Sequence, residues 1–178
     1  MAKVGIFFGS DSGKTRKVAK MIYEAFGSDE VAAPININKA SIDDLLAFDY
    51  LILGTPTLGD GQLPGLECDC QTESWAEFVP SIESADFGGK TIALFGLGDQ
   101  TSYGNVFVDA LGELFDVVSE AGANVVGYWP NEGYEFDSSN ALDGDDFVGL
   151  VIDQDNQSSM TAERVKTWVT GLKAEFAL

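Results

Sequence analysis

Three loops of the sequence carry small and polar side chains of the kind that bind phosphate groups and planar rings. The first runs Gly9-Ser10-Asp11-Ser12-Gly13-Lys14-Thr15. It superficially resembles the phosphate loop of nucleotide triphosphatases, but it has three residues between its glycines where that motif has four, and Phe8 stands where the motif needs glycine. Hydroxyls and backbone N–H groups at a helix start still bind phosphate without positive charge. The loop therefore indicates a phosphate-binding turn, with a ligand-free helix cap as the alternative.

The second and third loops have features that suit a flat ligand. The second spans Thr55 to Leu66, where an apolar side chain, Leu58, is followed by two glycines that permit positive φ and close backbone approach. The third spans Gly96 to Asn105 and combines small residues with an aromatic ring, Tyr103. Because ligands of open α/β sheets bind outside the carboxyl ends of the strands, the loops together predict one site.

The composition excludes several kinds of chemistry. The sequence has no histidine, which excludes histidine-dependent triads and dyads, imidazole proton relays and histidine-ligated zinc. Cys68 and Cys70 form a C-x-C spacing that matches neither a zinc ribbon nor the redox C-x-x-C motif. We interpret them as free thiols in a surface loop and expect no metal site.

Charge and hydropathy limit the partners and the location. The 178 residues include 10 basic and 29 acidic side chains, for a net charge of -19. Such a chain repels nucleic acid and anionic membranes and attracts basic protein surfaces. No apolar stretch approaches membrane-spanning length and no signal peptide is evident. We expect a cytoplasmic protein with a single domain over residues 1–178.

Short apolar runs alternate with longer segments of helical spacing, and these elements must position the loops. The strand-like runs are nearly continuously apolar, as is typical of parallel strands buried on both faces. Strands are predicted at residues 4–8, 31–37, 50–54, 91–96 and 124–128. Helices are predicted at residues 14–26, 42–47, 73–82, 106–121 and 162–176, the last with Thr161 as N-cap.

This alternation requires right-handed crossovers and predicts an α/β fold with a doubly wound, five-stranded parallel sheet and helices on both faces. Residues 129–157 break the rhythm because they are rich in Asn, Asp, Ser and Gly. They contain one further strand-like run, 147–152. We interpret this segment as an insertion that adds a small strand pair before the last helix. Aromatic residues at helical or strand spacing, among them Trp75 and Phe107, are assigned to the core.

At the three loops the sequence closely resembles the long-chain flavodoxins. The matching segments are 9–15, 54–61 and 95–103, with further matches at 127–129, 133–136, 147–150 and 155–158. The insertion resembles the one that separates long-chain from short-chain members, and the run from Thr55 to Cys70 is most similar to flavodoxins that serve nitrogen fixation. The resemblance implies strand order 2-1-3-4-5 and non-covalent FMN. Flavodoxins are themselves a known example of FMN at the switch point between strands one and three.

The resemblance also implies which residues hold FMN. Residues of the first loop would wrap the phosphate, and the flavin ring would lie between Leu58 and Tyr103. Many relatives carry tryptophan where Leu58 stands, so one face of the ring would be held by apolar contact area rather than by aromatic stacking. Many also carry asparagine where Val106 stands, so the contact of that asparagine would be lost or shifted to Asn105. The implied cofactor-binding residues are Ser10, Asp11, Ser12, Gly13, Lys14, Thr15, Thr55, Pro56, Thr57, Leu58, Gly59, Asp60, Gly61, Gly96, Leu97, Gly98, Asp99, Tyr103, Asn105, Asp153 and Asp155.

The implied function is that of a low-potential one-electron carrier with no substrate turnover of its own. Fully reduced FMN is an anion, which is penalised by a site without Arg or His beside Asp60 and Asp99. In the family, the carbonyl at the position of Gly59 flips to accept a hydrogen bond from protonated flavin N5. Glycine lowers the strain of that flip and so stabilises the neutral semiquinone. We expect shuttling between semiquinone and hydroquinone, tuned by Gly59 and Asp60.

The resemblance implies that the protein is a monomer and that its partners are redox proteins with basic faces. Ferredoxin-NADP reductase or another reductase would be the donor, and the nitrogenase reductase component is a candidate acceptor. Acidic residues around the loops form either a docking rim or a solvated face: Asp60, Glu67, Asp69, Glu73, Glu77 and Asp99. Two other function classes are alternatives to an electron carrier. One is a receiver-type domain, which needs an acidic cluster after the first strand. The other is an FMN-dependent reductase of a small substrate such as a quinone.

Overall fold

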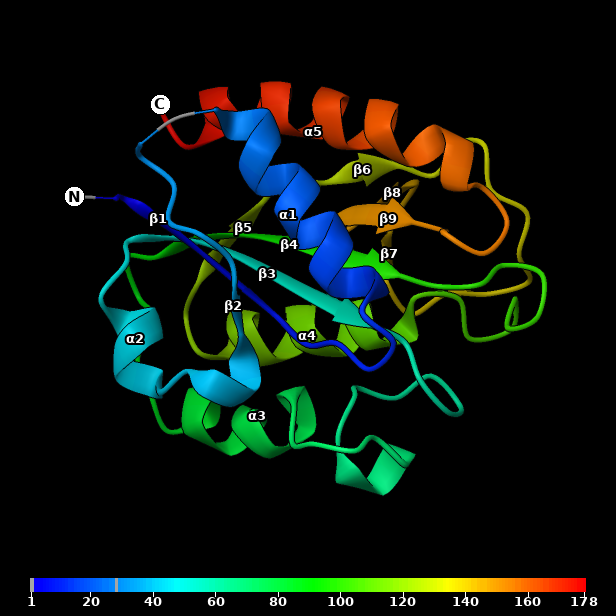
Figure 1. The fold of residues 1–178 in the computed structure, drawn as a ribbon, viewed down its shortest axis with the longest axis horizontal. Helices are drawn as coiled ribbons and strands as arrows, with labels where there is room; N and C mark the ends of the chain where they lie inside the picture. The colour runs from blue at the N-terminus through cyan, green and yellow to red at the C-terminus, as the bar shows by residue number, and fades with distance from the viewer. Residues whose placement is uncertain (1, 28) are drawn as a thin grey trace.

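A parallel sheet of buried strands runs through the centre of the protein (Figure 1). The computed structural model describes residues 2–27 and 29–178. The strand order is β2-β1-β3-β4-β5, which confirms the predicted doubly wound topology. The strands are β1 Val4–Phe8, β2 Ile35–Asn36, β3 Tyr50–Pro56, β4 Thr91–Leu97 and β5 Asn124–Val126, and all their pairings are parallel.

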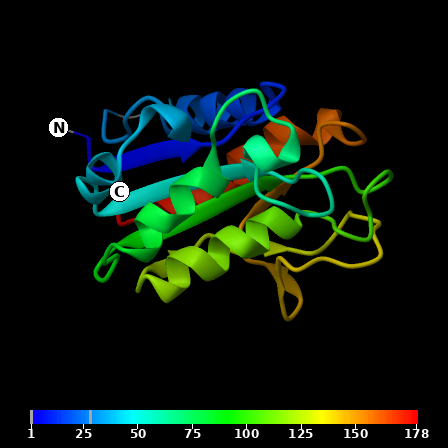
Figure 2. The same ribbon diagram turned by 90° about the horizontal axis from the view of Figure 1, so that it is seen from below.

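Helices cover both faces of this sheet, as Figure 2 shows from its edge. Helices α1 (Lys14–Phe26) and α5 (Thr161–Glu175) lie side by side on one face. Helices α3 (Trp75–Glu83) and α4 (Asp109–Glu120) lie on the other, where the short α2 (Ile42–Leu46) also contributes to the core. Within the described part of the chain, no helix has the length and apolar character needed to cross a membrane.

Two hydrophobic cores hold these layers together. Successive strand residues point to opposite faces of the sheet, so Phe7 packs toward α3 and α4 while Phe8 packs toward α1 and α5. Both rings are almost fully buried, as are Leu94 and Phe95 at the matching step of β4. Burying each such side chain stabilises the fold by roughly 1.5–3 kcal/mol. Strands buried on both faces explain why their sequences are continuously apolar.

The fifth strand position of the sheet is built from two separate segments. β5 pairs with Thr91–Ala93 of β4, and a further strand, β9 (Leu150–Ile152), pairs with Phe95–Leu97 of the same edge. Between them lies a small antiparallel sheet of β6 (Trp129–Pro130), β7 (Leu142–Asp143) and β8 (Asp146–Phe147). The insertion therefore adds three strands where we predicted a pair. The predicted strand 147–152 was wrong as one unit, because the chain leaves β8 before it enters β9.

Several predicted boundaries were also wrong, each for a local backbone reason. β5 ends before Gly127, which has a φ of 78°. α4 begins only at Asp109, because Val108 takes a left-handed conformation with a φ of 49°. Thr161 is the first residue of α5 rather than its N-cap, a position held by Met160. β2 is a two-residue strand, with one further bridge between Val31 and Val4.

Candidate functional site

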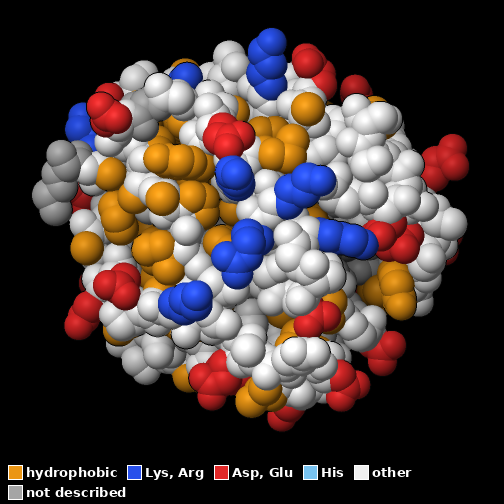
Figure 3. All heavy atoms as spheres, in the orientation of Figure 1, with side chains coloured by type: hydrophobic (Ala, Val, Ile, Leu, Met, Phe, Trp, Pro, Cys, Tyr) orange, Lys and Arg blue, Asp and Glu red, His pale blue; other side chains and the backbone are white. Residues whose placement is uncertain are grey.

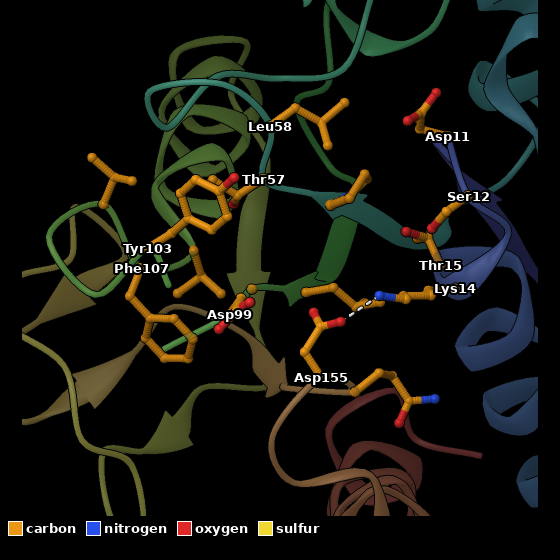
Figure 4. A pocket seen from close by; sticks show the side chains of 16 residues that line it. Asp11, Ser12, Lys14, Thr15, Thr57, Leu58, Asp99, Tyr103, Phe107 and Asp155 are labelled. Atoms are coloured by element: carbon orange, nitrogen blue, oxygen red, sulfur yellow. Dashed lines mark hydrogen bonds and ion pairs between the residues drawn. The ribbon is translucent and has the colours of Figure 1, made fainter. Parts of the chain in front are cut away.

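A cleft of about 270 Å³ lies where the carboxyl ends of β1, β3, β4 and β9 meet (Figure 4). The three loops singled out from the sequence all contribute to it, together with the segment that follows β9. The lining residues are Asp11, Ser12, Lys14, Thr15, Pro56, Thr57, Leu58, Leu97, Gly98, Asp99, Tyr103, Val106, Phe107, Val108, Gln154 and Asp155.

One wall of the cleft is the turn between β1 and α1. The Ser10 hydroxyl accepts a hydrogen bond from the Gly13 N–H (3.0 Å), and Gly13 has a φ of 90°. The first backbone bond of α1 runs from the Lys17 N–H to the Gly13 carbonyl, so the preceding N–H groups of the helix have no intrahelical acceptor. These N–H groups, with the hydroxyls of Ser12 and Thr15, form a donor set that suits a phosphate.

The carbonyl of Gly54 holds this wall against β3 and α3. It accepts hydrogen bonds from the Gly9 N–H (3.0 Å) and from the Trp75 indole N–H (2.8 Å). Gly9 has no room for a side chain, since a Cβ there would lie 2.6 Å from both the Ser74 hydroxyl and the Trp75 ring. Close packing therefore fixes where the turn begins.

The facing wall presents an apolar side chain and an aromatic ring, as Figure 4 shows for Leu58 and Tyr103. Leu58 is half-buried, and backbone bonds in both directions between it and Gln62 close a tight turn over Gly59 and Gly61. Those glycines have φ values of 53° and 101°. Tyr103 is 55% exposed, which is unusual for so large a ring. The two side chains leave surface available for a flat ligand.

The charges in the cleft are unbalanced. Lys14 pairs with Asp155 across the cleft (Nζ to Oδ1, 2.5 Å), and two further carboxylates, Asp11 and Asp99, also line it. Partial burial alone would raise the pKa of Asp99, but hydrogen bonds from the N–H groups of Ser102 and Thr101 and from the Asn156 amide lower that pKa below its ordinary value. The cleft thus holds three carboxylates against one ammonium.

Other predicted binding residues lie around the cleft rather than in its lining. Thr55 is fully buried and donates its hydroxyl hydrogen bond to the Pro56 carbonyl (2.8 Å). Asn105 faces the insertion, where its carbonyl accepts from the Ser138 hydroxyl (2.7 Å). Asp153 is completely buried beneath the loop after β9. Of the remaining ones, Ser10 and Gly13 border a neighbouring polar groove, Gly59, Asp60 and Gly61 form the turn after Leu58, and Gly96 is buried within β4.

Four lining residues were missed by sequence reasoning: Val106, Phe107, Val108 and Gln154. Phe107 was assigned to the core, and it is indeed fully buried, but it also forms part of the cleft. Because we predicted that a helix begins at residue 106, the turn that brings Val108 to the site was not recognised. Gln154 directly follows β9, so recognising that strand as part of the parallel sheet would have identified it.

Both cysteines are free thiols, but they are less exposed than predicted. Cys68 is half-buried and donates to the Gln62 side-chain carbonyl and the Leu63 carbonyl, both at 3.4 Å. Cys70 is buried, which corrects the surface-loop prediction. Burial, together with nearby carboxylates, raises the pKa of each thiol. Among the described residues, no group of Cys, Asp and Glu side chains is arranged to hold a metal ion.

Fewer carboxylates of the predicted acidic rim are exposed than the sequence suggested. The carboxylate of Glu77 accepts hydrogen bonds from the N–H groups of Ser74 (2.8 Å) and Leu66 (3.2 Å), so it caps α3 and secures the preceding loop. Asp99 is occupied in a similar way. The exposed members are Asp60, Glu67, Asp69 and Glu73.

Comparison with known proteins identifies the family. The sequence matches the family described as Flavodoxin over residues 6–168. It is 57% identical to a flavodoxin of Klebsiella pneumoniae, a similarity that covers 97% of this chain and 98% of that one. The chain belongs to the flavodoxin family. The chain is also 48% identical to flavodoxin 1 of Escherichia coli K12, a similarity that covers 100% of this chain and 97% of that protein.

A solved structure supports the same assignment. A Fusobacterium nucleatum flavodoxin bound to flavin mononucleotide superposes on this flavodoxin with a TM-score of 0.87 and 28% identity, over 98% of this chain and 99% of that one. Flavodoxins are electron-transfer proteins rather than enzymes. The alternative of a substrate reductase is therefore not favoured.

Proposed function

We propose that this flavodoxin is a low-potential, one-electron carrier that binds FMN non-covalently in the cleft. The observation that carries the proposal is the facing arrangement of the Ser10–Thr15 turn and the Leu58 and Tyr103 side chains (Figure 4). The turn offers hydroxyls and free N–H groups to the phosphate, and the opposite wall offers apolar area to the ring. The donor set and the shape of the lining residues both fit FMN.

The proposed contacts follow the position of each residue. Ser12, Lys14 and Thr15 would bind the phosphate, with Ser10 and Gly13 shaping the turn and Thr55, Pro56 and Thr57 closing its far side. Leu97, Gly98, Asp99 and Asp155 would line the ribityl chain and ring edge. Gly96, Asn105 and Asp153 lie outside the lining of the cleft, and we propose that they act on FMN through neighbouring residues.

The residues around the ring would set its redox behaviour. FMN supplies one-electron chemistry between its semiquinone and hydroquinone states. The three cleft carboxylates oppose added negative charge, and a penalty of about 1.4 kcal/mol corresponds to about 59 mV for a one-electron couple. Gly59, in its left-handed conformation next to Asp60, would let its carbonyl turn toward the flavin at little backbone cost.

The proposed partners are redox proteins with basic faces. The exposed carboxylates Asp60, Glu67, Asp69 and Glu73 border the cleft loops and would steer such partners without holding them. A reductase such as ferredoxin-NADP reductase would be the donor and a nitrogenase reductase component the acceptor. The sequence resemblance of residues 55–70 supports the nitrogen-fixation subgroup, and that of the insertion at residues 129–157 supports the long-chain type. A monomer in the cytoplasm completes the proposal, and the free thiols suit a reducing compartment.

The test of this proposal is a visible absorption spectrum of the full chain during anaerobic stepwise reduction. We expect oxidised flavin bands that pass through a blue intermediate before they bleach. A colourless protein that stays colourless after incubation with FMN would contradict the cofactor assignment. Direct bleaching without the blue intermediate would contradict one-electron chemistry while leaving FMN binding intact.

A further inference from the structure

We propose that Asp153 is a positioning residue that fixes the flavin-facing loop from Asp99 to Tyr103, and that the insertion braces this loop through Gln100. The inference rests on the proposed function, because it assigns a role in holding FMN to residues that do not reach the cleft. It also replaces the direct FMN contact that the resemblance implied for Asp153.

Asp153 is completely buried, and its carboxylate accepts five hydrogen bonds. Oδ2 accepts from the backbone and side-chain N–H groups of Gln100 (3.1 and 2.7 Å) and from the Asn156 amide (2.9 Å). Oδ1 accepts from the backbone N–H groups of Asp155 and Asn156 (3.1 and 3.0 Å). One side chain therefore ties the loop after β4 to the loop after β9.

This site requires a carboxylate rather than an amide. All five partners are N–H donors, and no ion pair in the described chain involves Asp153. Burying an unpaired charge is unfavourable, so these neutral donors must supply the stabilisation that a cation would otherwise give. In an Asp153→Asn variant the new NH₂ group would face at least two donors whichever way it is oriented.

The network continues from Asp153 to the wall of the cleft. The Asn156 amide that donates to Asp153 also donates to Asp99 Oδ1 (2.8 Å), and the Asp99 carbonyl accepts from the Tyr103 N–H (2.9 Å). Both Asp99 and Tyr103 line the cleft. A shift at Asp153 would therefore move the ring-facing wall, and it would reach the phosphate turn only indirectly, through Asp155 and its ion pair with Lys14.

The insertion supports the same loop from its outer side. Gln100, held by Asp153, accepts a hydrogen bond from the Glu135 N–H at its side-chain carbonyl (2.6 Å). The Gly104 carbonyl accepts from the N–H groups of Asp137 and Ser138 (2.8 and 3.0 Å). A side chain on Gly104 would not fit, since its Cβ would lie 2.7 Å from the Gln100 carbonyl oxygen. The segment between β6 and β7 thus forms a second support for the cleft wall.

The experiment compares FMN with riboflavin, which has the same ring and ribityl chain but no phosphate, on flavin-free full-length protein. For Asp153→Asn we expect both dissociation constants to rise by about tenfold, in equal proportion, as the loss of roughly one to two hydrogen bonds would cause. Titrations are made where far-UV circular dichroism shows the variant folded. A purely structural role would lower the resistance to urea and leave the affinities of the folded protein unchanged.

Three further variants sharpen the result. Asp116→Asn, on the exposed surface of α4, removes the same charge and should leave both affinities within twofold of the parent. Ser12→Ala, in the phosphate turn, should weaken FMN and not riboflavin. Gln100→Glu combined with Asp153→Asn exchanges donor and acceptor between the pair and should recover part of the affinity that Asp153→Asn loses.

If Asp153→Asn does not fold, Asn156→Ala tests the same link from an exposed position and should weaken both ligands by about threefold to fivefold. Parent-like affinity for both ligands in folded Asp153→Asn, or in Asn156→Ala when it is the variant tested, would overturn the inference. A loss confined to FMN would also overturn it, because it would place the effect at the phosphate. A parent protein that binds neither ligand would reject the proposed function and this inference together.

Discussion

Three carboxylates in or beside the cleft, Asp99, Asp153 and Glu77, are held by N–H donors rather than by cations. Asp99 accepts from backbone and amide groups and Glu77 caps α3, whereas among the cleft carboxylates of the described chain only Asp155 has a lysine partner. Hydrogen bonds of this kind keep a carboxylate ionised and fixed in place without neutralising it. At the scale of single residues, the site therefore combines precise geometry with uncompensated negative charge.

The first prediction concerns the glycine next to that charge. Replacing Gly59 by valine should raise the energy of the flavin semiquinone, because a β-branched residue restricts the backbone turn that presents the Gly59 carbonyl. Spectroelectrochemical titration should show a lower potential for the first electron and a higher one for the second. Gly144→Val, at a φ of 67° in the distant turn between β7 and β8, is the control and should leave both potentials unchanged. Unchanged potentials in Gly59→Val would reject the role of Gly59.

The second prediction concerns a tyrosine in the insertion. Burial raises the pKa of Tyr134 from 10.0 to about 12, against the opposing effects of Arg164 and of the hydrogen bond from Trp129. Its hydroxyl donates to the Val151 carbonyl (2.6 Å). Because the folded pKa is the higher one, this stabilisation is complete below the unfolded pKa and is lost as pH rises toward the folded value.

Between pH 10 and about 12, the free energy of unfolding of the parent should therefore fall more steeply than that of Tyr134→Phe. Urea denaturation across this range measures the two slopes. Absorbance titration of the phenolate provides a second check, since the variant should lose the last tyrosine to ionise. Equal slopes and an unchanged final phase would show that Tyr134 ionises normally.

At the scale of elements, the strands leave no spare space where they approach the cleft. A Cβ on Gly54 of β3 would lie 2.0–2.3 Å from atoms of the Phe95 ring on β4. Phe95 is fully buried among the side chains of α1 and α5, so its ring cannot move aside freely. The glycine therefore sets how closely the two central strands and their loops pack.

The third prediction follows from this packing. Gly54→Ala should destabilise the protein by roughly 1–3 kcal/mol, the usual cost of overfilling a well-packed core. Gly171→Ala, on the exposed side of α5 where a Cβ meets no neighbour, should instead stabilise it by roughly 0.5–1 kcal/mol. Urea denaturation of both variants checks the signs. A neutral Gly54→Ala would show that Phe95 can repack.

The elements that could be predicted from the sequence are those whose signal is local. Continuous apolar runs identified β1, β3 and β4, and the small residues after them identified the three loops. β9 and the three-stranded sheet were not resolved, because their short strands depend on pairing with residues far away in the chain. The turn at Val108 was missed because the apolar spacing of α4 continues through it, whereas the left-handed Val108 and the hydrogen bond from the Phe107 N–H to the distant Ser138 carbonyl (3.2 Å) precede the helix. The role of Asp153 also required the structure, since its donors come from two loops.

At the scale of the whole molecule, the few cations are concentrated on one side. Lys14, Arg16, Lys17 and Lys20 belong to α1, and Figure 3 shows Lys and Arg side chains gathered on the face that α1 and α5 cover. The exposed carboxylates of the 60–73 loop lie in a different part of the chain. The net charge of -19 is therefore unevenly distributed and can orient an approaching basic protein. That residues 1–178 form one domain stays a prediction.

The fourth prediction uses this charge distribution. The association rate with ferredoxin-NADP reductase, measured by stopped flow, should fall at least tenfold as ionic strength rises from 0.01 M to 0.1 M, while the Debye length shrinks from about 30 to about 10 Å. Glu67→Gln, on the rim, should slow association more than Glu163→Gln, which removes the same charge on α5. Equal effects of the two variants would indicate that net charge alone governs the encounter.

The division of the fifth strand position makes this protein suitable for fragment complementation. A break between Gly144 and Asp145, in the turn that joins β7 to β8, leaves β5 in the first fragment and β9 with α5 in the second. Each fragment then keeps one segment that pairs with β4, and the second also carries the helix that packs beside α1. We expect fragments 1–144 and 145–178 to reassemble when mixed and to recover flavin binding, which quenching of flavin fluorescence would report. A pair that stays apart would show that the uninterrupted insertion is needed to bring the two segments to the same edge.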